Sequence, residues 1–281
     1  MHADDLLGHS LRARAVRVSL GLPTHRVDAA QEFVSGDAVA EIARQAEAAG
    51  FAAVFVTDHP APPADWIAAG GHHTVDPFVT LSFAAASTTT LHLQTNLFVP
   101  AYRHPLLSAK LVASLDAMSR GRVILGVGAG YLQGEFEALG ADFDNRNDVL
   151  DHAIRTMRAA WTGDPTDGVL SLPSPAQAGG PPVWIGGNST RARARAARFD
   201  GWFADTSTAE QMSVRPDELA ELAARLPVGD GFDVIVHGYS DQVDPRAYEA
   251  VGTTWWLEDI HDRRGPFDEL LRLVEAGPPV N

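Results

Sequence analysis

Short apolar runs alternate with amphipathic helical stretches along almost the whole chain of 281 residues. The runs are rich in β-branched and aromatic residues, which is typical of strands that are covered on both faces in a parallel sheet. The sequence predicts strands at 16–21, 52–57, 91–98, 122–127, 182–186, 201–205, 232–237 and 253–257.

Helices are predicted between these strands from their periodicity and from their first and last residues. Asp37 is a candidate N-cap for a helix over 38–49, and Gly50 suits the left-handed position that ends it. Most of the others begin at or beside Asp, Ser or Pro, which favour the first turn. They are predicted at 77–87, 105–118, 148–160, 190–198, 216–225, 245–250 and 266–275.

Eight strand–helix pairs without a break in composition predict an α/β fold, a single-domain (β/α)8 TIM barrel over 16–281. The rival, a doubly wound open sheet, usually has fewer units and a Gly-rich turn after its first strand, whereas here 22–25 reads LPTH. Residues 1–15 are expected to form an N-terminal extension. The Pro- and Gly-rich stretch 161–181 is expected to be an irregular insertion before strand five, either a crossover or an active-site flap.

Charge and composition exclude several classes of function. The chain has 22 Lys+Arg against 36 Asp+Glu, and its net charge of −14 disfavours nucleic acid as a partner. It has no cysteine, which excludes disulfides and thiolate chemistry, and we predict no metal site because His72 and His73 lack further ligands at suitable spacing. No signal-peptide core and no apolar stretch of ~20 residues is present, so we expect a cytoplasmic protein without a membrane partner.

The residues that follow each strand are the candidate site, because a TIM barrel carries its site at the C-terminal ends of its strands. His59 follows strand two beside Asp58 and is the candidate acid/base, since histidine titrates near neutrality; a structural histidine is the alternative. The segment 186–189 (GGNS) offers backbone amides and a capping serine that suit a phosphate or carboxylate, with Arg191 and Arg193 close behind. A solvated arginine-rich face is the alternative.

Two weaker signals remain. The glycines in 126–130 are spaced G-x-G-x-G and do not form the G-x-G-x-x-G nucleotide fingerprint, so a tight strand-exit turn explains them equally well. Four aromatic residues could form a wall for a planar ligand or could be ordinary packing, namely Trp66, Tyr102, Tyr131 and Trp202.

Five segments together carry a resemblance to a known family. They are VFVTDH at 54–59, LHLQTNLFVPAYRHPLLSAKLVASLDAMSRGRVILGVGAGY at 91–131, EFEALGADFDNR at 135–146, PPVWIGGNSTRARARAARFDGWF at 181–203 and TTWWLE at 253–258. In this order they resemble the luciferase-like (bacterial luciferase) superfamily of flavin and deazaflavin oxidoreductases, and within it the F420-dependent branch. The resemblance implies an eightfold barrel with F420 or FMN at its C-terminal mouth.

The resemblance also implies roles for single residues. It implies a non-proline cis peptide at Asn96–Leu97 behind the cofactor ring, with Asp58 along the ring edge and His59 near the hydride-transfer centre. The cofactor phosphate would lie near two segments, Gly128, Ala129 and Gly130, and Gly187, Asn188 and Ser189. Gly186 and Arg191, singled out from the residues themselves, are further cofactor-binding candidates.

The substrate pocket would include Trp66, Tyr102 and Tyr131. In the sugar-phosphate branch of the family a glutamate follows the glycine turn and a lysine clamps the phosphate. Tyr131 stands at the glutamate position here, and the only lysine, Lys110, falls in a predicted helix, which disfavours a phosphosugar substrate.

The expected activity is hydride transfer between F420 and a small organic substrate, with His59 supplying a proton. An FMN-dependent monooxygenase and a non-catalytic cofactor-binding barrel are the alternatives. The resemblance also implies a possible homodimer, which no residue pattern in the chain demonstrates.

Overall fold

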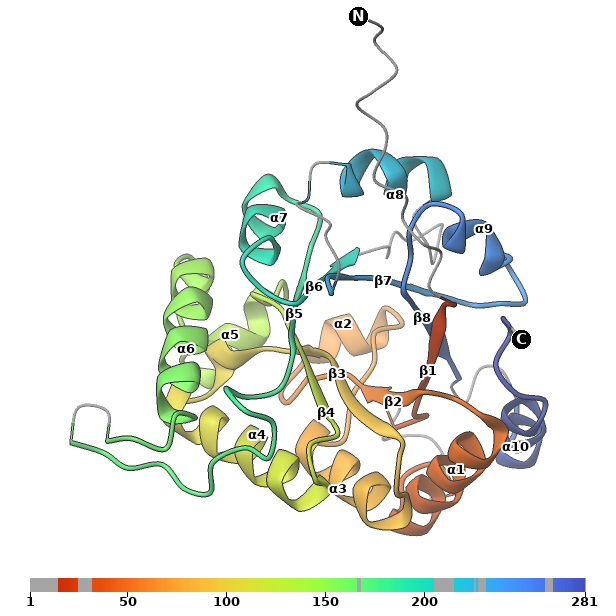
Figure 1. Ribbon diagram of the computed structural model, residues 1–281, viewed down its shortest axis with the longest axis horizontal. Helices are drawn as coiled ribbons and strands as arrows, with labels where there is room; N and C mark the ends of the chain where they lie inside the picture. The colour runs from red at the N-terminus through yellow and green to blue at the C-terminus, as the bar shows by residue number, and fades with distance from the viewer. Residues whose placement is uncertain are drawn as a thin grey trace, which may run out of the picture.

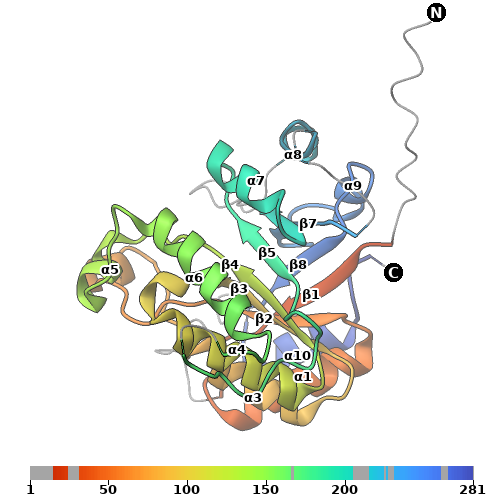
Figure 2. The ribbon, with the colours of Figure 1, turned by 60° about the vertical axis from the view of Figure 1, so that its left-hand side comes forward.

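The computed structural model describes residues 15–24, 32–165, 168–204, 215–224, 226, 231–260 and 265–280. In this part of the chain eight parallel strands close into a barrel in sequence order, with the helices packed around it (Figures 1 and 2). The closed barrel confirms the predicted TIM fold and excludes the doubly wound open sheet.

Each predicted strand matches an observed strand to within two residues at either end. The strands are β1 Arg17–Gly21, β2 Ala53–Val56, β3 His92–Phe98, β4 Val123–Val127, β5 Val183–Gly186, β6 Gly201–Ala204, β7 Asp233–Gly238 and β8 Trp255–Asp259. The last strand differs most, because Glu258 and Asp259, which were expected to follow it, form its last two residues.

The described helices include all eight predicted ones and two short additional ones. They are α1 Gly36–Ala49, α2 Ala64–Ala68, α3 Pro77–Ser87, α4 Pro105–Ser119, α5 Gln133–Leu139, α6 Arg146–Ala160, α7 Thr190–Ala196, α8 Pro216–Ala223, α9 Arg246–Glu249 and α10 Phe267–Glu275, with a 3-10 turn η1 at Pro100–Tyr102. The short helices α2 and α5 were missed because each precedes another helix in the connection after β2 or β4, whereas the strand–helix alternation predicts one helix per strand. None of the described helices is both long and apolar enough to span a bilayer.

One predicted cap was wrong. The N-cap of α1 is Ser35, whose hydroxyl accepts a hydrogen bond from the amide of Ala38 at 3.1 Å, and not Asp37. Asp37 instead lies in the first turn, where its negative charge favours the helix N-terminus.

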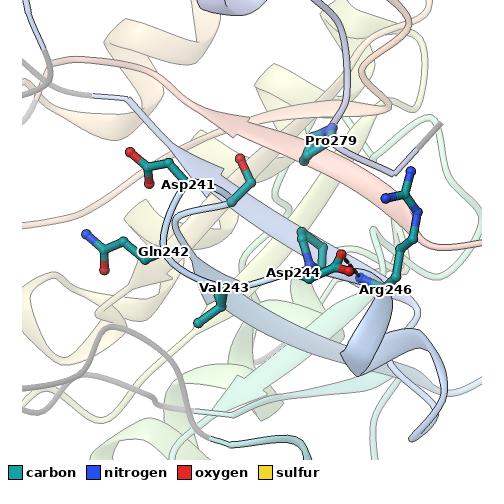
Figure 3. A pocket seen from close by; sticks show the side chains of 8 residues that line it. Asp241, Gln242, Val243, Asp244, Arg246 and Pro279 are labelled. Atoms are coloured by element: carbon teal, nitrogen blue, oxygen red, sulfur yellow. Dashed lines mark hydrogen bonds between the residues drawn. The ribbon is translucent and has the colours of Figure 1, made fainter.

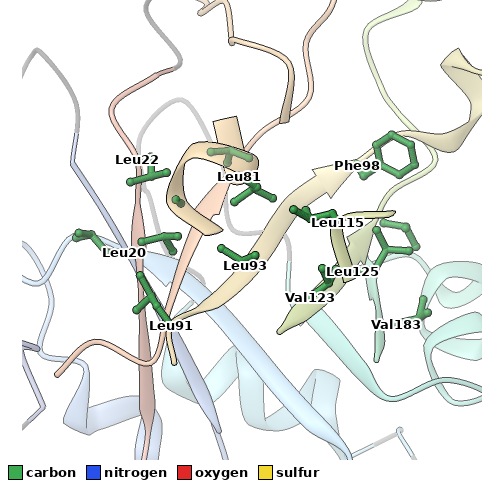
Figure 4. Packing of buried hydrophobic residues seen from close by; sticks show 14 of the residues in the cluster. Leu20, Leu22, Leu81, Leu91, Leu93, Phe98, Leu115, Val123, Leu125 and Val183 are labelled. Carbon is green, nitrogen blue, oxygen red and sulfur yellow. The ribbon is translucent and has the colours of Figure 1, made fainter. Parts of the chain in front are cut away.

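Alternation along the strands divides the core into two layers. Outward-facing residues such as Leu20 and Leu93 pack with helical residues such as Leu81 of α3 and Leu115 of α4 (Figure 4). A smaller cluster fills the barrel interior and comprises Ala53, Phe55, Ile124, Trp184, Phe203, Ile235, Trp255 and Leu257.

The insertion before β5 does not form an active-site flap. The side chain of Gln177 donates to Asp116 near the end of α4 at 2.7 Å and to the carbonyl of Val123, the first residue of β4, at 2.9 Å. Lys110 of α4 also donates to the carbonyl of Leu172. The segment therefore packs at the N-terminal end of β4, as expected for a connection that leads from a helix into a strand, while the mouth lies at the other end.

A single carboxylate joins α1 to the start of β3. The side chain of Glu47 accepts hydrogen bonds from the amides of Thr89, Thr90 and Leu91 at 2.8, 2.6 and 3.0 Å. Burial opposes its ionisation, but these amides outweigh burial and lower the pKa of Glu47 to about 2.

We expect Glu47→Gln to lower the free energy of unfolding at pH 7 by about 1–2 kcal/mol, because it replaces charge-assisted hydrogen bonds with weaker ones. The folded pKa lies below the unfolded one, so this contribution is complete above about pH 4.5 and is lost as the pH falls towards 2. Urea denaturation at pH 7 and pH 3 measures both effects. Glu41→Gln on the exposed face of the same helix is the matched control and should change stability by less than 1 kcal/mol. An equal loss for Glu47→Gln at both pH values would contradict this account.

Candidate active site

His59 lies just after β2, at the centre of a hydrogen-bonded aromatic group. Its Nδ1 lies 3.1 Å from Oε2 of Glu135, and its Nε2 lies 3.3 Å from the hydroxyl of Tyr131. The rings of Trp66, His72 and Tyr131 have centroids 5.2, 4.9 and 5.7 Å from the His59 ring. The loop after β2, which contains α2, and the loop after β4 thus meet around one imidazole that is 9% exposed.

Glu135 anchors this group from the N-terminal part of α5. Besides His59, its fully buried carboxylate contacts the amide of Ala61 at 3.0 Å and the hydroxyl of Tyr102 at 2.9 Å, and accepts a hydrogen bond from each. Burial alone would raise the pKa of Glu135, but the hydrogen bonds from His59 and Ala61 outweigh it and hold the pKa below its ordinary value. Burial and the nearby Glu135 raise the pKa of Tyr102, which therefore stays a neutral donor. The arrangement gives His59 a fixed, negatively charged partner.

Asp58 forms a buried ion pair beside this group. Its carboxylate is 1% exposed and is held by both terminal nitrogens of Arg103, at 2.7 and 2.8 Å, and by the amide of Val99 at 3.0 Å. Burial raises the pKa of Asp58, and the Arg103 guanidinium opposes that shift. Both oxygens are used by the protein, so the geometry shows Asp58 joining the end of β2 to the segment after β3. Its predicted contact with a cofactor edge stays a prediction.

The peptide bond between Asn96 and Leu97 is cis, as the resemblance implied. Leu97 packs against the cluster inside the barrel, next to glycines of β4 and β5. A Cβ on Gly186 would clash with the Leu97 side chain, and a Cβ on Gly128 would lie 3.2 Å from its Cδ1. These glycines therefore leave room for Leu97, a packing requirement that their sequence spacing did not reveal.

The predicted phosphate residues lie at the ends of β4 and β5, which pair with each other. Ser189 caps α7 as expected by accepting a hydrogen bond from the amide of Ala192 at 3.1 Å. Arg191, in contrast, is exposed and ion-paired with Asp148 and Asp151 of α6. This geometry gives no support to the prediction that Arg191 binds an anionic group, and the roles of Gly128, Ala129, Gly130 and 186–189 stay predictions.

Trp66, Tyr102 and Tyr131, predicted as pocket residues, all lie in the group around His59, directly or through Glu135. Trp202 instead donates from its indole to the carbonyl of Gly187 at 2.9 Å and is fully buried. The sequence analysis missed Glu135 and Arg103. Glu135 stands in the EFEALG segment that carried the resemblance, but its pairing with a residue 76 positions away left no local signal.

An open pocket lies between the loop that follows β7 and the C-terminal segment (Figure 3). It is lined by Ser240, Asp241, Gln242, Val243, Asp244, Pro245, Arg246 and Pro279, and contains none of the residues around His59. The amide of Ser240 donates to the carboxylate of Glu258, which ties this loop to β8. The candidates after β6, at 205–207, lie outside the described residues.

The sequence pattern of the family described as Luciferase-like monooxygenase matches residues 17–272. The chain belongs to this family. The match covers the whole barrel and includes every residue of the group around His59.

Relatives in this family differ in their cofactors. An F420-dependent hydroxymycolic acid dehydrogenase of Mycobacterium tuberculosis is 32% identical over 58% of this chain and 47% of its own length. An FMNH2-dependent dimethylsulfone monooxygenase of Pseudomonas fluorescens is 27% identical over 84% of this chain and 70% of its own length. The chain thus spans about half the length of the first relative. These two relatives thus depend on different cofactors, a deazaflavin and a flavin.

Solved structures share the fold at low sequence identity. An F420-dependent secondary alcohol dehydrogenase in complex with an F420-acetone adduct superimposes with a TM-score of 0.71 and 16% identity, over 95% of this chain and all of the other. A monooxygenase from Streptomyces bottropensis gives a TM-score of 0.69 and 18% identity, over 93% of this chain and 97% of the other.

We expect Arg103→Met to lower the free energy of unfolding by about 3–5 kcal/mol, because it leaves the Asp58 carboxylate buried without its partner. Arg44→Met removes an exposed arginine paired with Glu41 and should cost less than 1 kcal/mol. Urea denaturation of both variants at pH 7 checks the difference. Equal, small losses would show that the buried pair does not hold the two strand ends together.

Proposed function

We propose that this chain is an F420-dependent oxidoreductase that transfers a hydride to or from a small organic substrate at the C-terminal mouth of the barrel. The observation that carries the proposal is the geometry of His59, an imidazole held between the ionised Glu135 and Tyr131 at a strand exit. Family membership and the F420-dependent relative support the choice of cofactor.

The residues at the mouth fit a planar ring system. Leu97 is partly exposed at the upper end of the interior cluster, where it offers an apolar surface. The neighbouring Asn96 Oδ1 is buried and has no hydrogen-bond partner among the described residues, so it is available to a ring N–H. Asn96 and Leu97 would hold the ring, and the glycine segments after β4 and β5 would hold the phosphate end.

When bound, the cofactor supplies the hydride, and the protein supplies orientation and proton transfer. His59 holds or releases a proton at its Nε2, where the Tyr131 hydroxyl lies within hydrogen-bonding distance. Glu135 holds the ring from the opposite nitrogen, with its Oε2 3.1 Å from Nδ1. Trp66 and His72 pack against the same ring and exclude water from it.

The second candidate is an FMN-dependent monooxygenase. It is favoured by the FMNH2-dependent relative, whose alignment covers more of this chain than that of the F420-dependent one. The same residues would then surround a flavin ring.

Titration of the purified chain with F420 and, separately, with FMN, followed by fluorescence, distinguishes the candidates. We expect saturable binding of F420 at micromolar or lower concentration and much weaker binding of FMN. Tight binding of FMN alone would replace the proposal with the monooxygenase. If neither F420 nor FMN binds, the chain is not a cofactor-dependent oxidoreductase and the proposal fails.

We expect His59→Asn to lower kcat by about 100- to 10,000-fold, because it removes the proton-transfer group. Glu135→Gln should lower kcat less, since the amide keeps a hydrogen bond to His59 but loses the charge. Steady-state kinetics with reduced F420, together with F420 affinity, measure both effects. His152→Asn on the exposed face of α6 is the control and should leave kcat unchanged. Full activity in His59→Asn would remove the assigned role.

A further inference from the structure

A second histidine–carboxylate pair lies inside the barrel, separate from the group around His59. Nε2 of His237, near the end of β7, lies 3.5 Å from Oδ2 of Asp259, the last residue of β8. Both side chains are 12% exposed. Nothing in the proposed role of His59 uses this pair.

Contacts place the pair on the inner face of the barrel at its C-terminal end. The ring of His237 meets that of Phe55, a member of the interior cluster, with centroids 5.9 Å apart and planes at 83°. Gly21, the last residue of β1, is the register partner of Asp259. A Cβ on Gly21 would clash with Oδ1 of Asp259 and lie 2.6 Å from Cζ of Phe55, so the glycine makes room for both side chains.

The His237–Asp259 pair also lies across the barrel from Leu97, whose side chain forms an apolar surface at the mouth. Leu97 packs against the glycines of β4 and β5, and in a closed ring of eight strands β8 lies opposite β4. One half of the mouth therefore presents a leucine and glycines, and the other half presents an imidazole and a carboxylate. Desolvating two ionisable groups beside Phe55 costs stability, which a purely structural role would not require.

We propose that His237, oriented by Asp259, binds the carbonyl or hydroxyl oxygen of the substrate. The His237 imidazole lies within ion-pair distance of Asp259 and packs edge-on against the rings of Phe55 and Tyr239, and these contacts together set its orientation. Asp259 is a positioning residue in this arrangement. The inference rests on the proposed function in assuming that the cofactor ring occupies the Leu97 side, which leaves the His237 side to the substrate. It specifies a substrate with one polar oxygen on an otherwise apolar body.

The first test uses the cofactor-free chain and does not depend on the proposed function. NMR spectra of the chain with 13C-labelled histidine rings are recorded during titration with cyclohexanone, and the His237 signal is identified by its loss in His237→Asn. We expect a saturable shift of the His237 signal and none for His92, which lies at the opposite end of the barrel at the start of β3. In Asp259→Asn the affinity should fall at least fivefold. No saturable shift at His237 would overturn the proposal.

The second test separates substrate from cofactor. In His237→Asn we expect kcat/KM for cyclohexanone reduction by reduced F420 to fall by about 10- to 100-fold, with the Kd of F420 changed less than twofold. A tenfold weaker Kd of F420 with an unchanged KM for cyclohexanone would assign His237 to cofactor binding and overturn the proposal. If the unsubstituted chain binds neither F420 nor FMN, the proposed function fails while the NMR titration still decides the role of His237.

The third test displaces Asp259 without changing any titratable group. Gly21→Ala places a methyl group against Asp259 and Phe55. We therefore expect kcat/KM for cyclohexanone to fall as in His237→Asn, while the Kd of F420 changes less than twofold. His92→Asn is the matched control, because it removes an imidazole from the far end of the barrel, and it should leave kcat/KM and the Kd of F420 unchanged. Circular dichroism verifies that each variant folds. A folded Gly21→Ala variant with unchanged kcat/KM would contradict the positioning role of Asp259.

Discussion

The buried pair between Asp58 and Arg103 is the interaction on which the mouth of this barrel depends. It joins the end of β2 to the segment after β3, and so connects the strand exit that carries His59 with the one that carries the cis peptide. Because Asp58 precedes His59 directly, its fixed position sets the place from which the imidazole can reach Glu135. A bidentate arginine suits this task, since its planar fork fixes direction as well as distance.

Close packing around Leu97 is the second constraint, and it changes the meaning of the glycines. Their sequence spacing suggested a phosphate cradle or a tight turn. In the structure, Gly186 is required first of all because the Leu97 side chain of β3 occupies the space beside it, and Gly128 lies against the same side chain. The amide of Gly128 itself donates to the carbonyl of Phe98 at 3.0 Å, so this amide is used within the barrel.

Much of the fold could be predicted from the sequence, because eight buried strands leave a strong local pattern of short apolar runs. Helices such as α2, which come in addition to the one helix of each strand–helix pair, lie outside this pattern. The site was predictable where a residue follows a strand, as His59 does, and not where its partner comes from elsewhere, as with Glu135 and Arg103. The same limit applies to Arg191. Its charge suggested that it binds an anionic group, but its partners are carboxylates of α6, 40 or more positions away in the sequence. For the insertion 161–181 the sequence left a crossover and an active-site flap open, because composition does not show at which end of the barrel a segment packs.

The insertion 161–181 is an exposed, irregular segment that takes no part in the site around His59. Leu170 lies within it, about half exposed, on a connection that packs on α4 and the N-terminal end of β4. Since the chain contains no cysteine, one cysteine introduced at this position would be a unique thiol. A fluorophore or a surface attachment placed there would lie on an exposed segment that contains none of the residues around His59, which makes this position suitable for immobilising or labelling the protein.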